Sequence, residues 1–150
     1  MPSPKINPDA SGQKSNIMTN KKLKSVFIVD DSAIERSMLT DHLSKNEGVE
    51  IKEFSNGESC IKELVMGNVQ EPDLILMDYF LETSPGSQKD GLEVLTKLKE
   101  ICPDSQVIML TSVSNEKIKE LAKNKGALDY VVKSQISYQQ LDDVLQKHFS

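Results

Sequence analysis

The sequence predicts an α/β fold, with a five-stranded parallel sheet in the order 2-1-3-4-5 and helices on both faces. Short apolar runs alternate five times along the chain with stretches in which apolar residues recur at helical spacing. Four of the runs are continuously apolar, which is typical of parallel strands covered on both faces. Strands that alternate with helices in this way form a parallel sheet with right-handed crossovers.

The strands are expected at residues 25–30, 49–54, 73–78, 106–111 and 127–132. The second is the exception, because apolar and charged residues alternate along it, and alternation indicates a half-exposed strand. We therefore place it at the edge of the sheet. The order 2-1-3-4-5 then follows most simply, with its topological switch point between the first and third strands.

Capping residues and apolar spacing delimit the helices between the strands. The first begins with Ser32 and Glu35 in capping-box spacing, and its apolar residues are Ile34, Met38 and Leu43. The second is expected at about 57–67, and the last begins with a second capping box. Gly67 is expected to end the second helix and Gly126 the fourth, and the third helix is expected to end before Pro103. Ser137 and Gln140 form the second capping box.

Composition indicates one globular domain. The chain has 150 residues, of which 37% are hydrophobic and 27% charged. The net charge of -5 argues against direct nucleic acid binding, and no apolar stretch is long enough to cross a membrane. Cys60 and Cys102 are the two cysteines, which suits a reducing compartment, and we expect a cytoplasmic protein. Residues 1–23 are rich in polar residues and are expected to be a disordered tail before a domain at 24–150.

Polar residues with chemical capacity follow four of the expected strands. The apolar run of the first ends in Asp30-Asp31, Asp78 ends the third, Thr111 ends the fourth and Lys133 follows the fifth. The carboxyl ends of parallel strands meet at one edge of the sheet, where open α/β sheets place their ligand sites. Converging carboxylates repel one another unless they retain protons or hold a cation, and oxygen ligands of this kind suit Mg²⁺. A carboxylate beside Mg²⁺ can accept a phosphoryl group.

These residues, in this order, resemble the receiver domain of bacterial two-component response regulators. The resemblance covers residues 24–149 and includes Tyr130, three residues before Lys133. It implies a flavodoxin-like fold in which Asp78 accepts a phosphoryl group from a sensor histidine kinase or a histidine phosphotransfer protein. It also implies that Lys133 contacts the phosphoryl group, and that the chain has no other enzymatic activity than this transfer and a slow self-dephosphorylation.

The same resemblance implies a magnesium site and a switch. Asp31 would bind Mg²⁺ directly, Asp30 largely through water, and the backbone carbonyl of Phe80 would complete the protein ligands beside Asp78. Thr111 would move toward the phosphoryl group and Tyr130 would rotate inward. The surface of the fourth helix, fifth strand and fifth helix would then change for a downstream protein partner. We expect a stand-alone receiver.

Three departures from the family pattern carry expectations of their own. The segment 80–91 is longer than usual, and Ser134 stands where proline usually follows the lysine. Phe80 and Val113 occupy positions that orient the hydrolytic water in some relatives, and neither side chain can do so by hydrogen bonding. The sequence therefore predicts slow self-dephosphorylation.

Three other functions remain open from the residues alone. A pseudo-receiver would keep the fold as an interaction module without phosphorylation. An aspartate-nucleophile phosphatase usually has a second Asp two residues after the nucleophile, where Phe80 and Ser32 stand after Asp78 and Asp30. Flavin or nucleotide binding would require a glycine-rich phosphate loop after the first strand, where the sequence has Asp-Asp-Ser.

Overall fold

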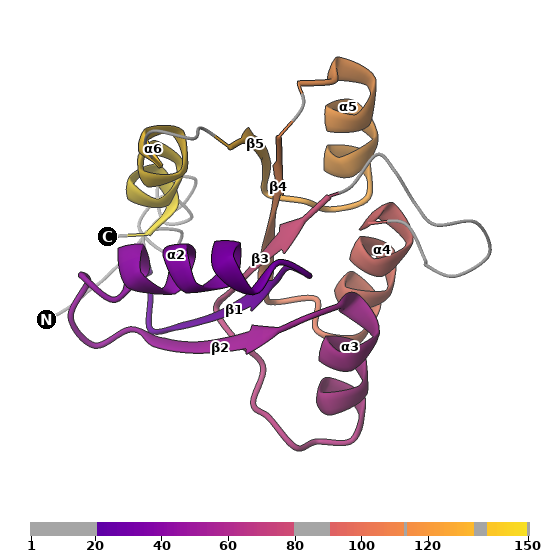
Figure 1. Ribbon diagram of the computed structural model, residues 1–150. Helices are drawn as coiled ribbons and strands as arrows, with labels where there is room; N and C mark the ends of the chain where they lie inside the picture. The colour runs from indigo at the N-terminus through magenta and orange to yellow at the C-terminus, as the bar shows by residue number, and fades with distance from the viewer. Residues whose placement is uncertain (1–20, 80–90, 113, 134–137, 150) are drawn as a thin grey trace, which may run out of the picture.

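A computed structural model describes residues 21–79, 91–112, 114–133 and 138–149, and shows one parallel sheet in the order β2-β1-β3-β4-β5 (Figure 1). The predicted fold and strand order are confirmed. The strands are β1 Ser25–Val29, β2 Glu50–Phe54, β3 Leu74–Asp78, β4 Gln106–Thr111 and β5 Asp129–Val132. The helices are α2 Ala33–Leu43, α3 Gly57–Val65, α4 Gly91–Ile101, α5 Glu116–Asn124 and α6 Gln139–His148.

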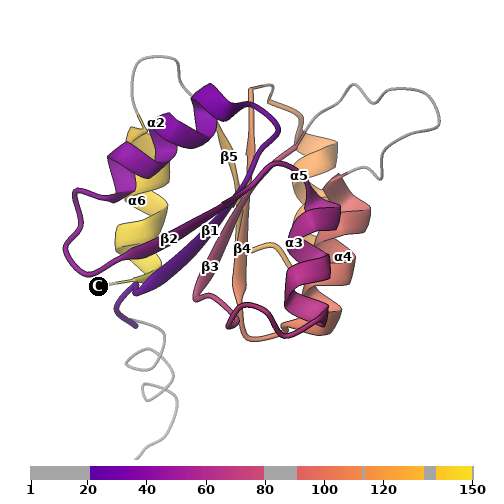
Figure 2. The ribbon, with the colours of Figure 1, turned by 60° about the horizontal axis from the view of Figure 1, so that its bottom comes forward.

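Helices cover both faces of the sheet, with α2 and α6 on one face and α3, α4 and α5 on the other (Figure 2). Side chains along a strand alternate between faces, so each central strand contributes to two cores. In β3, for example, Ile75 and Met77 pack toward α3, α4 and α5, whereas Leu74 and Leu76 pack toward α2 and α6. Burial on both faces explains why the central strands are continuously apolar.

The second strand, β2, lies at the edge of the sheet, as its alternating sequence predicts. It pairs with β1 in parallel, and Glu50, Lys52 and Glu53 are exposed. Glu53 accepts hydrogen bonds from two side chains of α2, Arg36 at 3.3 Å and Thr40 at 2.7 Å. Glu53 therefore attaches α2 to the edge strand of the sheet.

Two helix stops are glycines in the left-handed region, where a side chain would be strained. Gly67 has φ of +74° and follows α3, and Gly126 has φ of +107° and follows α5. The N-cap residue of α6 is Tyr138, which makes no side-chain capping hydrogen bond, and the Gln140 side chain accepts a hydrogen bond from the backbone N–H of Val132 at 3.2 Å. Ser137, the other member of the expected second capping box, lies outside the described residues.

The apolar face of α2 differs from the expected one. Ile34 and Met38 are 74% and 48% exposed, whereas Leu39 and Leu43 are buried against the sheet. Residues four apart share a helix face, so these are two neighbouring stripes, and only the leucine stripe reaches the core. Of the three apolar residues that the sequence marks in this helix, only Leu43 is buried.

Truncating the leucine stripe tests this assignment. Leu39→Ala is expected to lower the free energy of unfolding by about 2–5 kcal/mol, because it removes a fully buried side chain and leaves a cavity. Met38→Ala, one residue away on the exposed stripe, should change it by less than about 1 kcal/mol. Urea denaturation of both variants measures the difference, and equal losses would contradict the assignment.

Residues just before position 24 also contact the folded domain. Lys21 forms a parallel β-bridge with Phe149, and Leu23 is buried in the α2 and α6 core. The Asp73 carboxylate accepts hydrogen bonds from the backbone N–H groups of Lys24 and Ser25 and forms an ion pair with Lys21 at 2.8 Å. Residues 1–20, the rest of the expected tail, lie outside the described residues.

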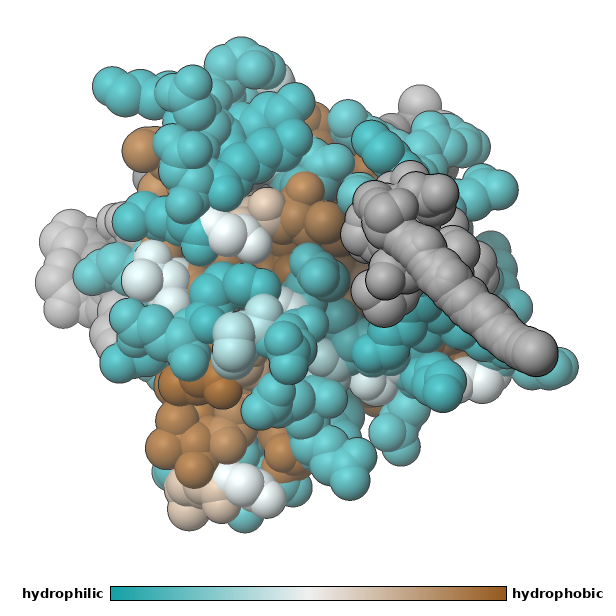
Figure 3. All heavy atoms as spheres, turned by 180° about the vertical axis from the view of Figure 1, so that it is seen from behind, coloured by the Kyte–Doolittle hydropathy of each residue, from teal (hydrophilic) through white to brown (hydrophobic). Residues whose placement is uncertain are grey.

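The cysteines and the exposed apolar side chains are the remaining features of the fold. Cys60 and Cys102 are buried free thiols, and burial raises the pKa of Cys60 to about 12. Apolar side chains gather over the end of α3, where Val65 and Met66 are exposed (Figure 3). None of the described helices combines the length and the apolar character that crossing a membrane requires.

Candidate functional site

The residues singled out at the strand ends lie at one edge of the sheet. Asp30 follows β1, Asp78 is the last residue of β3, Thr111 is the last residue of β4 and Lys133 follows β5. The parallel register places these strand ends side by side. The convergence predicted from the sequence is therefore present in the fold.

Three carboxylates form the centre of the site. Asp30, Asp31 and Asp78 each present an oxygen, and these oxygens lie within 4.8 Å of one another. The Asp30 and Asp78 side chains are 1% and 3% exposed, whereas Asp31 is exposed. The Oδ2 atoms of Asp30 and Asp78 are buried and have no hydrogen-bond partner among the described residues. Buried polar atoms are rarely left unsatisfied, so this pair of oxygens suits a ligand.

Local hydrogen bonds fix Asp30 at the turn between β1 and α2. Its Oδ1 accepts from the backbone N–H of Ser32 at 2.9 Å, and its backbone N–H donates to the carbonyl of Phe54 at 3.0 Å. The guanidinium of Arg36 donates to the Asp30 carbonyl at 2.6 Å. The hydroxyl of Ser32 in turn accepts from the N–H of Glu35 and caps α2. The Asp30 carboxylate is thus oriented by the start of the helix.

The ammonium of Lys133 joins the carboxylates. Its Nζ donates to Asp78 Oδ1 at 2.6 Å, lies 3.7 Å from Asp30 Oδ2 and also donates to Glu35 Oε1. The backbone N–H of Lys133 donates to the carbonyl of Thr111, which ties the residue to the end of β4. Sequence reasoning did not assign Glu35 to the site, because its spacing from Ser32 indicated a helix cap.

Burial and mutual repulsion raise the pKa values of the buried carboxyl groups. Desolvation by burial, with repulsion from Asp78, raises the pKa of Asp30 to about 7, against the hydrogen bond from Ser32 and the charge of Lys133. Burial also raises the pKa of Asp78, although Lys133 opposes the shift. Burial alone would lower the pKa of Lys133, but its hydrogen bonds to Asp78 and Glu35 raise it above the usual value. The site carries more negative charge than one ammonium neutralises.

These features fit a hard divalent cation. The carboxylate oxygens are the ligand type that Mg²⁺ and Ca²⁺ prefer, and two of them are buried without hydrogen bonds from the described residues. Asp30, Asp31 and Asp78 are the residues that could hold the cation. A bound cation would also supply the missing positive charge.

The stability of the metal-free protein should fall as the pH rises from about 4 to about 7. Asp30 keeps its proton in the folded state up to a pKa of about 7, whereas the unfolded chain loses it near 3.8, so the folded state binds more protons within this window. The loss should be on the order of 2–4 kcal/mol, and the raised pKa of Asp78 acts in the same direction.

Urea denaturation in a chelator at pH 4.5 and 7.5 measures this dependence. Asp30→Asn should flatten it, and Mg²⁺ should stabilise the protein at pH 7.5 more than at pH 4.5, because a cation binds the deprotonated carboxylates. Stability of the metal-free protein that is constant or rises over this range would contradict the assignment of the buried charges.

The two residues expected to form a switch lie on neighbouring strands. Thr111 is 1% exposed at the end of β4, and Tyr130 is 4% exposed in β5 and belongs to the core under α4 and α5. Tyr130 pairs in register with Met109, two residues before Thr111, so both lie toward the same face of the sheet. The tyrosine is therefore already buried in this structure.

Several sequence-based expectations fall outside the described residues. They concern the carbonyl of Phe80 as a metal ligand, the position of Val113, the segment 80–90 and the Ser134 that replaces proline.

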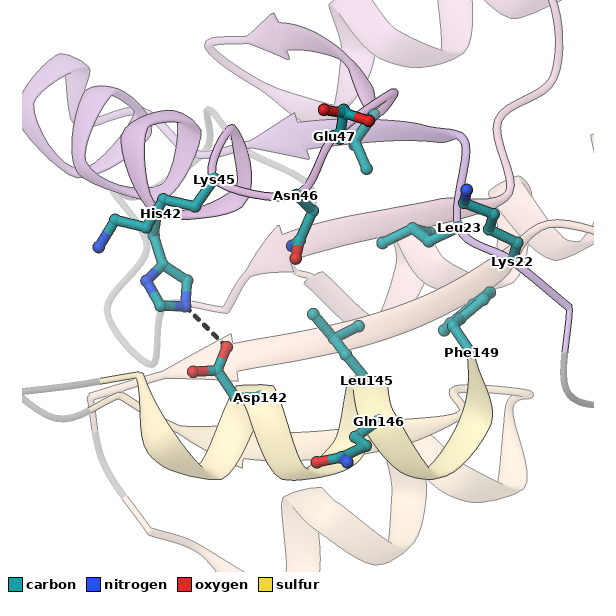
Figure 4. A pocket seen from close by; sticks show the side chains of 11 residues that line it. Lys22, Leu23, His42, Lys45, Asn46, Glu47, Asp142, Leu145, Gln146 and Phe149 are labelled. Atoms are coloured by element: carbon teal, nitrogen blue, oxygen red, sulfur yellow. Dashed lines mark hydrogen bonds and ion pairs between the residues drawn. The ribbon is translucent and has the colours of Figure 1, made fainter.

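A hollow of about 650 Å³ lies at the opposite end of the strands, before β1 and β2. It is lined by Lys22, His42 and Leu145 among others, and a hydrogen bond of 2.7 Å between the His42 ring and the Asp142 carboxylate joins α2 to α6 beside it (Figure 4). None of the three clustered carboxylates lines it. The clustered carboxylates therefore lie away from this hollow.

Curated relatives match most of this chain. Response regulator protein VraR of Staphylococcus epidermidis is 30% identical over 124 residues, which cover 83% of this chain and 56% of that protein. The VraR protein of Staphylococcus aureus is 30% identical over 122 residues, covering 81% of this chain and 54% of that protein. The chain thus spans about half the length of these relatives.

Solved structures share the fold. The CheX-CheY-BeF3-Mg complex of Borrelia burgdorferi matches with a TM-score of 0.67 and 26% identity, covering 81% of this chain and 87% of that chain. The N-terminal domain of a response regulator/sensory box/GGDEF protein of Carboxydothermus hydrogenoformans matches with a TM-score of 0.66 and 28% identity, covering 82% and 91%. The family model of the response regulator receiver domain matches residues 26–146. The chain therefore belongs to the response regulator receiver domain family.

Proposed function

We propose that this chain is a phospho-accepting switch of a two-component phosphorelay, in which Asp78 receives a phosphoryl group from a phosphohistidine. One observation carries the proposal. Asp78 Oδ1 is held by Lys133 at 2.6 Å, while Asp78 Oδ2 is buried beside Asp30 without a hydrogen bond from the described residues. An oriented carboxylate with one unengaged oxygen is arranged as a nucleophile.

Mg²⁺ is the proposed cofactor. Asp30, Asp31 and Asp78 would hold it, with Asp31 binding directly, Asp30 largely through water, and the Phe80 carbonyl as a further ligand proposed from the sequence. When bound, the cation would neutralise charge on the phosphoryl oxygens. The name of the Borrelia burgdorferi complex includes both Mg²⁺ and BeF3, which supports the choice of this cation.

The residues of the chain divide the remaining tasks. The Asp78 carboxylate forms a bond to phosphorus while the bond from phosphorus to the histidine nitrogen breaks, and the imidazole leaves with that electron pair. Lys133, already beside Asp78, stabilises the charge that spreads over the phosphoryl oxygens. Thr111, at the end of the neighbouring strand, would donate a hydrogen bond to the phosphoryl group. Tyr130 would keep its buried position when Thr111 has moved.

Exposed apolar side chains near the site suit a protein donor. Ile34 and Met38 form the outer stripe of α2, the helix that begins at the acidic cluster. Apolar side chains in contact with a partner contribute to binding when they are buried in the interface. We assign this stripe to the contact with a sensor histidine kinase or histidine phosphotransfer protein, in the cytoplasm. The output surface is assigned to α5, β5 and α6 and a downstream protein.

Intact-mass spectrometry tests this function. After incubation with acetyl phosphate and Mg²⁺, the protein is expected to gain one phosphoryl group, and a chelator should prevent the gain. A folded protein that gains no group under these conditions would contradict phospho-acceptance and favour an interaction module that keeps the fold without phosphorylation.

The phosphorylated form is expected to be long-lived. Phe80 and Val113 cannot orient a hydrolytic water through their side chains by hydrogen bonding, so hydrolysis lacks this assistance. Removing the donor and following the mass of the adduct measures its lifetime. Phe80→Asn introduces an amide at one of the two positions and should shorten it. A lifetime of only seconds for the unsubstituted protein would contradict this expectation.

A further inference from the structure

The ammonium of Lys133 is shared between two carboxylates of different exposure. One is Asp78, whose side chain is 3% exposed, and the other is Glu35, whose side chain is 44% exposed and extends from the first turn of α2. Asp30 lies 3.7 Å from the same nitrogen. Lys133 therefore bridges the end of β5 to α2 across the site.

The start of α2 explains why Glu35 is available for this contact. In a capping box, the side chain at this position accepts a hydrogen bond from the backbone N–H of the cap residue, which is Ser32. That N–H instead donates to Asp30 Oδ1 at 2.9 Å. The orientation of Asp30 thus removes the local donor for Glu35, and the Glu35 carboxylate pairs with Lys133.

We infer that Glu35 is a positioning residue that holds Lys133 in the unphosphorylated protein and thereby restrains the phosphorylation of Asp78. The inference rests on the proposed function of Asp78. A phosphoryl group arriving at Asp78 must share Lys133 with Glu35, whose negative charge also opposes the approach of an anionic donor. The Glu35 charge reaches the centre of the site, since it acts to raise the pKa of both Asp30 and Asp78.

Glu35→Gln removes this charge and keeps the size of the side chain. With acetyl phosphate, the Asp78 oxygen bonds to phosphorus as the bond from phosphorus to the acetate oxygen breaks, and acetate leaves with the electron pair. The second-order rate constant of this reaction is expected to rise about two- to five-fold, the range for loss of a partly exposed ion pair.

Glu53→Gln is the matched control. Glu53 is similarly exposed at 37% and also forms an ion pair, with Arg36 of α2, and among the described residues it makes no hydrogen bond or ion pair with Lys133. The substitution makes the same change in net charge and should leave the rate constant unchanged. Glu35→Asp keeps the charge but shortens the side chain by one methylene, and it should give a rate between those of Glu35→Gln and the unsubstituted protein.

A second readout follows Lys133 itself without magnesium or phosphorylation. Brief treatment with an amine-acylating reagent, followed by peptide mass spectrometry, reports how accessible and how strongly paired each lysine is. Acylation of Lys133 should rise several-fold in Glu35→Gln relative to Glu53→Gln, while acylation of the exposed Lys24 should be equal in both. A purely structural role of Glu35 would raise acylation at many lysines together.

The outcomes separate this inference from the proposed function. If the unsubstituted protein is phosphorylated and Glu35→Gln neither accelerates the reaction nor exposes Lys133, the inference is overturned and the proposed function stands. If no variant is phosphorylated, the proposed function fails, and the restraint on phosphorylation fails with it. A faster reaction together with selective acylation of Lys133 supports the inference.

Discussion

Asp78→Asn is expected to remove phosphoryl acceptance completely while leaving the protein folded. The amide is close in size to the carboxylate but is a poor nucleophile, so it cannot form the bond to phosphorus. The backbone around Asp78 is held by the sheet, because Met77 pairs with β1 and Asp78 pairs with β4 in the parallel register. Intact-mass spectrometry with acetyl phosphate and Mg²⁺ should detect no adduct in this variant.

Asp41→Asn provides the control for this loss. Asp41 is an exposed residue of α2, and the substitution makes the same chemical change away from the three clustered carboxylates. It should be phosphorylated at the same rate as the unsubstituted protein. An adduct that forms equally well in Asp78→Asn would place the acceptor at another residue.

Lys133→Met is expected to weaken both stability and reactivity. The substitution removes the ammonium group that donates a hydrogen bond to Asp78 and lies beside Asp30. The buried carboxylates of the metal-free protein then have no ion-pair partner among the described residues. Removing one partner of a buried ion pair costs about 3–5 kcal/mol, so the metal-free protein should lose stability of this order at neutral pH. Phosphorylation by acetyl phosphate should slow by about 10²–10³-fold, the typical cost of losing one charge-stabilising donor.

Lys123→Met is the matched control for Lys133. Lys123 also pairs with an aspartate, Asp129, at 3.6 Å, but its side chain is 47% exposed. Its loss should cost at most about 1 kcal/mol and leave phosphorylation unchanged. Urea denaturation in a chelator and again with Mg²⁺ measures both variants. A Lys133→Met protein as stable as Lys123→Met in the chelator would show that the lysine does not balance the buried carboxylates.

Much of the fold could be predicted because its signals are local. Continuous apolar runs such as Leu74 to Met77 indicate strands covered on both faces, and the alternation of β2 indicates an edge. The strand order then brings Asp30 and Asp78 to one edge of the sheet. Their convergence follows from parallel topology alone and requires no knowledge of side-chain contacts.

The parts that sequence reasoning missed depend on competition between contacts. Glu35 has the spacing of a capping box, but the backbone N–H of Ser32 that it would bind donates to Asp30 instead. Its actual partner, Lys133, is distant in sequence, so spacing could not identify it. Ile34 and Met38 have helical spacing, yet the neighbouring leucine stripe is the one that reaches the sheet. Periodicity shows that a helix has an apolar stripe, but the packing of α2 on the sheet decides which stripe is buried.

Locating the phosphoryl group on the chain tests the central claim most directly. The protein is incubated with acetyl phosphate and Mg²⁺, treated with borohydride to convert an aspartyl phosphate to homoserine, and analysed by peptide mass spectrometry. Conversion of Asp78, and retention of Asp30 and Asp31 as aspartates, is the predicted result. Conversion at any other aspartate, or an adduct that resists borohydride, would contradict the assignment of Asp78 as the acceptor.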